Sequence, residues 1–167
     1  MNTNILLTHL STLKWALALS LVSGAAWAQT AGVAVEGAWV RATVPSQKGT
    51  GAFMSLTAQE AMTLVGVSSP VAGVAEVHEM KMEGDIMTMR ALPLLELPAG
   101  KKITLKPGGH HIMLMDLKEP LALNSTVPVI LLFKNAKGVQ TKQALTLPVR
   151  TVAPNSPAGQ APAVHAH

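Results

Sequence analysis

Residues 75–92, AEVHEMKMEGDIMTMRAL, contain two runs of alternating side chains separated by Gly84-Asp85. Alternation with a period of two is typical of a β-strand, and a Gly-containing pair between two such runs is typical of a tight turn. These residues therefore predict a β-hairpin. If Gly84 and Asp85 form its loop, Met80 lies directly opposite Met89.

The rest of the chain predicts further strands and no helix. Short β-branched and apolar runs alternate with Gly, Pro, Asn and Asp, and no stretch keeps a 3.6-residue apolar period for three turns. We expect nine strands, near residues 33–42, 52–58, 62–68, 75–82, 86–92, 101–105, 111–117, 127–133 and 139–149. That number in about 120 residues predicts an all-β fold, a β-sandwich or Greek-key barrel.

Composition excludes several classes of site. The chain has 167 residues, the length of one domain, and 49% of them are hydrophobic. It contains no cysteine, which excludes disulfides, thiolate zinc sites, iron–sulfur clusters and cysteine nucleophiles. The net charge of +4 is too small and too scattered to indicate a nucleic-acid-binding surface. Nine Met and six His remain as the side chains suited to soft-metal chemistry.

The first 28 residues predict a signal peptide. They carry one charged side chain, Lys14, followed by an apolar run over residues 15–26 and the sequence Ala-Trp-Ala at 26–28. The run is shorter than the roughly 20 residues of a spanning helix, although an uncleaved anchor is the alternative. We expect cleavage after Ala28, one β-sandwich domain at residues 29–150, no stable membrane insertion after cleavage, and an exported protein whose intact mass begins at Gln29.

Residues 151–167 are rich in Pro, Ala and Gly and predict a disordered tail. The chain ends in His-Ala-His, with imidazoles at His165 and His167. We interpret these two as ordinary side chains, and a weak Cu(II) site is the alternative. Truncation of the tail should leave folding unchanged.

A Met/His cluster is the candidate site. Six of the eight Met beyond residue 28 fall between residues 80 and 115. Because side chains alternate along a strand, one face of the hairpin presents a set of imidazole and thioether groups. One face of the strand at 111–117 presents a second set. The sets are His78, Met80, Met82, Met87 and Met89, and His111, Met113 and Met115. Such neutral, soft donors favour Cu(I); packing of flexible Met in a core is the alternative.

Other residues have structural interpretations. Met54 and Met62 lie on other strands and are expected to be packing residues, as is Trp39. We expect Arg41 to tie a strand to a loop carboxylate. His110 points away from the face that His111 shares with Met113.

The spacing of four of these residues resembles the signature of the periplasmic copper chaperones called PCu(A)C. Ten residues separate His78 from Met89, twenty-one separate Met89 from His111, and one separates His111 from Met113. The resemblance covers about residues 33–149. It implies a cupredoxin-like β-sandwich that binds one Cu(I) through these four residues. It also implies a copper-accepting partner, such as a Sco-type protein or a cytochrome c oxidase subunit, and delivery towards oxidase maturation.

Three other functional classes are alternatives to a copper carrier. A periplasmic copper-buffering or tolerance protein without a dedicated recipient has the same ligands. A copper enzyme is disfavoured because the chain has no Tyr, no Cys and no third imidazole on the same face. A purely structural domain does not explain the spacing of the four residues. We therefore expect a monomeric, non-enzymatic carrier.

Overall fold

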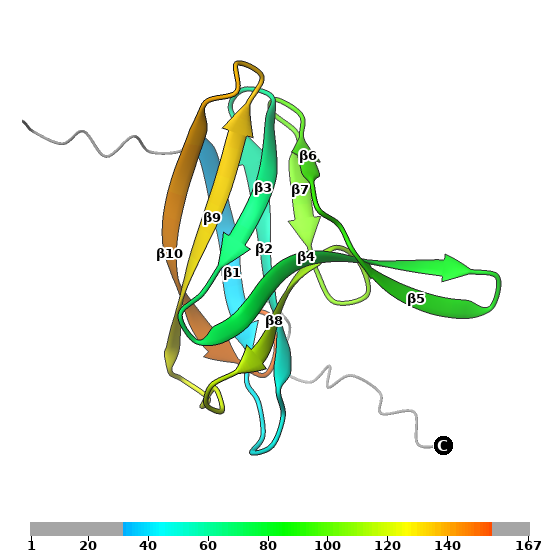
Figure 1. The fold of residues 1–167 in the computed structure, drawn as a ribbon, viewed down its shortest axis with the longest axis vertical. Coiled ribbons are helices and arrows are strands. Elements are labelled where there is room, and N and C mark those ends of the chain that lie inside the picture. The colour runs from blue at the N-terminus through cyan, green and yellow to red at the C-terminus, as the bar shows by residue number, and fades with distance from the viewer. Residues whose placement is uncertain (1–31, 155–167) are drawn as a thin grey trace, which may run out of the picture.

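The computed structural model describes residues 32–154, which form a β-structure with ten strands and no helix (Figure 1). The strands are β1 Val33–Arg41, β2 Gly49–Ala58, β3 Met62–Ser68, β4 Ala72–Glu83, β5 Ile86–Ala91, β6 Leu95–Leu97, β7 Lys102–Leu105, β8 His111–Leu117, β9 Thr126–Asn135 and β10 Gln140–Arg150. The predicted all-β class is therefore confirmed.

The strands pair in the order β5-β4-β8-β2-β1-β10-β9-β3-β6, and β7 pairs with β2. Nearly all neighbours are antiparallel. The exception is the short parallel pairing of β1 with β10 at Val40 and Arg41, which joins the half of the molecule around β2 to the half around β9. Figure 1 shows these two layers face to face, with the β4–β5 hairpin projecting to one side as an arm.

The core lies between the layers because alternate side chains of each strand point inward. In β9 the inward set is Val127, Val129, Leu131 and Phe133, all fully buried, and the residues between them are more exposed. In β4 and β8 the inward side chains include Val77, Ile112 and Leu114, which are buried in the same core. The opposite face of these two strands carries the candidate site.

The hairpin has the predicted register. Met80 pairs with Met89, Met82 with Met87, and Glu83 with Ile86, so that Gly84 and Asp85 form the loop. Gly84 has φ 65°, which a residue without Cβ adopts readily in a tight hairpin turn.

One strand was not predicted. β6 has only three residues and lies between Pro93 and Pro98, too short for a periodic signal. It exists because it pairs with β3 and buries Leu95 and Leu97. The expected signal peptide at 1–28 and most of the expected tail, with His165 and His167, lie outside the described residues.

Within residues 32–154, no helix has the length and apolar character required to cross a membrane.

Candidate metal centre

Three adjacent strands bring the predicted ligands onto one sheet face. β4 pairs with β8 so that His78 lies opposite His111, and β4 pairs with β5 so that Met80 lies opposite Met89. Directly opposed residues in an antiparallel pair project to the same face. Met113 therefore shares this face, opposite Glu76 on β4.

The two imidazoles form the buried centre of this face. His78 is 8% exposed and His111 is 5% exposed, and their ring centroids lie 6.0 Å apart. Since a ring nitrogen binds a metal at about 2.0–2.1 Å, both rings can contact one ion at this separation. The sequence separates these residues by more than thirty positions, and the β4–β8 pairing makes them neighbours.

His78 carries an unpaired nitrogen. Its Nε2 donates a hydrogen bond of 3.1 Å to the Glu76 carboxylate, which can only accept, so Nε2 bears the proton. The lone pair is then on Nδ1, which is buried and has no hydrogen-bond partner among the described residues. An orphaned buried acceptor costs free energy unless something satisfies it, and a metal ion is a suitable partner.

His111 is oriented in a comparable way. Its Nδ1 lies 2.9 Å from the Gly109 carbonyl oxygen and must donate to it. The lone pair of His111 is therefore on Nε2, the nitrogen on the far side of the ring. A hydrogen bond that fixes the tautomer of one ring nitrogen and leaves the other free is typical of metal-binding histidines.

Thioethers border the imidazoles. Met80 and Met113 line a hollow of about 140 Å³ together with His111, Arg41 and Phe53. Met89 does not line the hollow; it is 51% exposed on the neighbouring strand β5. The structure thus brings together His78, His111 and Met113, adds Met80, and places Met89 one strand farther out.

The side chains on this face set its chemical character. They offer two imidazoles with thioethers, a combination that suits a soft cation better than zinc or a hard cation. Within residues 32–154, no group of three or more His, Cys, Asp or Glu side chains is positioned to hold a metal ion.

Aromatic side chains support the site from β1 and β2. Trp39 and Phe53 stack with centroids 4.7 Å apart, and Phe53 lies 6.4 Å from the His111 ring. Trp39 is buried as predicted, although it packs on this outer face and not in the main core cluster. Gly51, opposite Met113, provides the space for the Phe53 ring.

Gly51→Ala is expected to destabilise the fold by about 1–3 kcal/mol, in the range for inserting a methyl group into a packed site. A Cβ at this position would lie 2.6 Å from Phe53 Cζ, so the ring must move. Urea unfolding followed by circular dichroism measures the change. Gly49→Ala on the same strand is the control, because its Cβ would have no neighbour closer than 3.6 Å. Equal stability of the two variants would contradict the prediction.

The prediction for Arg41 is wrong. Its guanidinium lies 5.5 Å from the centroid of the Phe53 ring, a cation–π distance, and it forms no ion pair with any described residue. The partner of Arg41 is therefore an aromatic face at the rim of the hollow and not a loop carboxylate.

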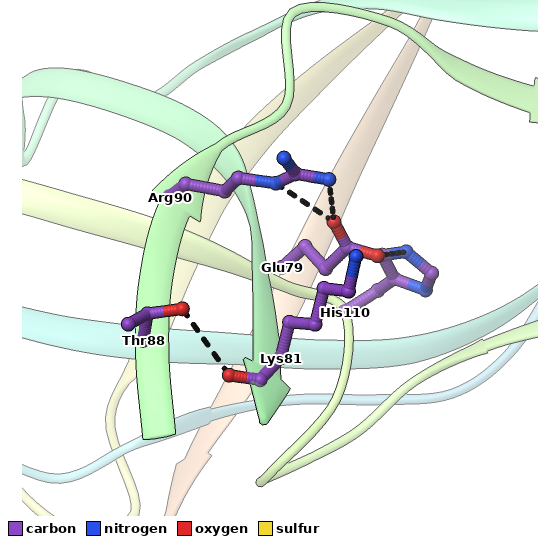
Figure 2. A network of polar contacts seen from close by, with 5 residues as sticks. All are labelled: Glu79, Lys81, Thr88, Arg90 and His110. Carbon is purple, nitrogen blue, oxygen red and sulfur yellow. Dashed lines mark hydrogen bonds and ion pairs between the residues drawn. The ribbon is translucent and has the colours of Figure 1, made fainter. Parts of the chain in front are cut away.

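The other face of the hairpin carries a polar network (Figure 2). Arg90 donates from Nε and Nη2 to the Glu79 carboxylate at 3.0 and 2.8 Å, and His110 Nε2 lies 3.6 Å from the other oxygen. The hydrogen bond from Arg90 lowers the pKa of Glu79 below its ordinary value of 4.5. This pair therefore stabilises the fold above pH 4.5, and its contribution is lost as the pH falls through the lowered pKa. His110 faces this network, as expected from alternation.

Sequence reasoning missed two residues of the centre: Glu76 orients His78, and Phe53 packs beside His111. Met80, which the sequence placed on the same face as the predicted ligands, lines the hollow. The position of Glu76, two residues before His78 on the same strand face, was the only available signal for its role. Met54 and Met62 are buried in the core, and their predicted packing role is confirmed.

Comparisons with known proteins agree with this fold. The LpqE-like family model, described as "Putative lipoprotein LpqE-like", matches residues 33–149. A protein of Leifsonia xyli subsp. xyli, named "Putative lipoprotein Lxx21020", is 34% identical over 108 residues, 64% of this chain and 65% of that protein. The chain thus matches less than two thirds of the length of this relative.

Solved structures of other proteins have a similar fold. The solution structure of CuI-DR1885 from Deinococcus radiodurans has a TM-score of 0.57 at 34% identity, over 75% of this chain and 83% of that one. The apo PCuAC domain from PmoF1 has a TM-score of 0.58 at 23% identity, over 72% of this chain and 95% of that one. These likenesses confirm the expected cupredoxin-like fold and PCu(A)C resemblance. With its family model matched from the first strand almost to the end of the last, the chain belongs to the LpqE-like family.

Proposed function

We propose that this protein is a periplasmic copper chaperone that carries one Cu(I) through His78, Met89, His111 and Met113. The observation that carries the proposal is the buried, unpartnered Nδ1 of His78 beside His111, with thioethers on the same sheet face. Two similar solved structures support the proposal, because one is described as CuI-DR1885 and the other as a copper-bound PCuAC domain from PmoF2.

The ligand set suits a carrier because it combines selectivity with release. Thioethers are neutral and soft and favour Cu(I) over Cu(II). Two imidazoles and two thioethers add no negative charge, so Cu(I) leaves more easily than from thiolates. Glu76 holds the proton of His78 on Nε2, which keeps Nδ1 available for the ion.

Exposure supports transfer to a second protein. The imidazoles are buried, whereas Met89 is half exposed on the projecting hairpin. A partner can therefore displace the outer thioether first while the imidazoles still hold the ion. Thiolates of an acceptor protein bind Cu(I) more strongly than imidazoles and thioethers do, so the ion passes from the carrier to the acceptor. This order of ligand exchange needs no change in the oxidation state of copper.

Met89→Leu is expected to weaken Cu(I) binding at least tenfold, about 1.4 kcal/mol. The substitution removes the sulfur but roughly conserves side-chain volume, so the fold should lose less than about 1.5 kcal/mol. Anaerobic competition with a Cu(I) chelator measures the affinity. X-ray absorption of the loaded wild type should report equal numbers of nitrogen and sulfur ligands, and the variant should show one sulfur fewer.

Met87→Leu is the matched control because Met87 lies on the same strand and face, with similar exposure, one residue pair farther from the imidazoles. Its equilibrium affinity should equal that of the wild type. Wild-type affinity in Met89→Leu with a large loss in Met80→Leu would assign the outer sulfur to Met80, which already lines the hollow.

We also propose an envelope location. The family and the Leifsonia relative bear names that include the word lipoprotein, and lipoproteins are exported envelope proteins. The 167 residues contain no cysteine to which a thioether-linked lipid could attach, and residues 1–28 have the pattern of a signal peptide. Export directed by this segment places the proposed carrier in the periplasm.

Delivery towards cytochrome c oxidase, through a Sco-type protein or an oxidase subunit, is the proposed destination. The competing role is copper buffering without a dedicated recipient. Deletion of the gene followed by oxidase assays under copper limitation separates them, because only a delivery protein is required for oxidase activity when copper is scarce. Normal activity in the deletion strain would favour buffering.

A further inference from the structure

The projecting hairpin carries a second pair of opposed thioethers. Met82 on β4 pairs with Met87 on β5, one pair beyond Met80 and Met89 on the same face. Met82 and Met87 are each 53% exposed. Successive residues on one strand face lie about 6.6 Å apart, so the two pairs form a short ladder that leads from the loop to the imidazoles.

Packing does not account for the outer pair. Met54 and Met62 are core residues and are almost completely buried, which is the ordinary use of Met as a flexible filler. Met82 and Met87 have half of their surface in solvent, with Ile86 still more exposed beside them. Exposed apolar side chains at paired positions require another explanation.

The opposite face of the hairpin keeps the ladder in register. Glu79 and Arg90 form a cross-strand ion pair, and Thr88 Oγ1 donates to the Lys81 carbonyl oxygen at 3.2 Å (Figure 2). His110 links the same network to the residues before β8. These contacts stabilise a two-stranded arm that the main core does not cover, and thus hold the thioether pairs opposite each other.

Building on the copper-carrier function proposed above, we propose that Met82 and Met87 form an outer Cu(I) site through which the ion enters and leaves the inner one. Two neutral thioethers directly opposed across a β-pair can hold a soft cation in two-coordinate form. Glu83 and Asp85 at the loop add negative charge that attracts a cation. Transfer inward exchanges one sulfur ligand at a time, and copper remains Cu(I) throughout.

The inference predicts a kinetic effect without an equilibrium one. In the double variant Met82→Leu/Met87→Leu, the affinity of the inner site should stay within twofold of wild type. Loading and release should both slow at least tenfold. The affinity is the ratio of the loading and release rate constants, so both constants must fall by the same factor if the affinity is unchanged. Stopped-flow transfer of Cu(I) from the loaded, full-length mature protein to bathocuproine disulfonate measures release. Met54→Leu, buried in the core, should transfer at the wild-type rate.

Occupancy of the two sites can be observed directly. With methyl-labelled Met, the first equivalent of Cu(I) should shift the NMR signals of Met89 and Met113, and excess Cu(I) should shift those of Met82 and Met87. Unshifted Met82 and Met87 signals in excess Cu(I), wild-type transfer rates in the double variant, or a large loss of inner-site affinity would each overturn the inference. The absence of any shift at Met89 and Met113 would instead contradict the proposed inner site.

Discussion

His111→Ala is expected to weaken Cu(I) binding at least a hundredfold, about 2.8 kcal/mol at 1.4 kcal/mol per factor of ten. The substitution removes the imidazole whose Nε2 lone pair is left free by the Nδ1 hydrogen bond to Gly109. Among residues 32–154, it also leaves His78 as the only imidazole on this face. Anaerobic titration against a Cu(I) chelator, with circular dichroism to verify the fold, measures the effect.

His110→Ala is the control for this experiment. It deletes the adjacent imidazole, which contacts Glu79 on the opposite face of the hairpin. Its Cu(I) affinity should remain within about twofold of wild type. A folded His111→Ala variant with wild-type affinity would remove His111 from the site, and a greater loss in His110→Ala would assign the ligand to its neighbour.

Phe133→Ala is expected to destabilise the fold by about 3–5 kcal/mol, the usual cost of removing a fully buried phenyl ring. Phe133 lies in β9, opposite Leu64 of β3, and its side chain is completely buried in the core. Since small domains are stable by only about 5–15 kcal/mol, the variant should unfold at a temperature lower by on the order of 10 °C or more. Thermal unfolding followed by circular dichroism provides the measurement.

Ile130→Ala tests whether burial causes this effect. Ile130 lies on the same strand but on its outer side, where more than a third of its surface is exposed. Its loss of stability should be several-fold smaller than that of Phe133→Ala. Similar losses at the two positions would show that the inward face of β9 has been assigned incorrectly.

The hairpin shows what local sequence determines. Two alternating runs around Gly84-Asp85 were sufficient to predict the pairing of Met80 with Met89, because a two-residue loop sets the register of both strands. Alternation also predicted which side chains share a face, including the separation of His110 from His111. By contrast, β6 could not be predicted, since its three residues become a strand only by pairing with β3.

The arrangement of the metal centre depended on tertiary structure. Pairing of β4 with β8 places His78 beside His111, whereas a sequence pattern cannot specify which distant strands become neighbours. Pairing of β1 with β2 places the Arg41 guanidinium over the Phe53 ring, whereas the contact of Glu76 with His78 is local, between two residues of β4. Sequence by itself therefore determined the longer strands, their faces and the types of donor atom, because these follow from the two-residue period of a strand. Only tertiary structure decided the distances and hydrogen bonds among the donors, because these depend on contacts between strands far apart in the chain.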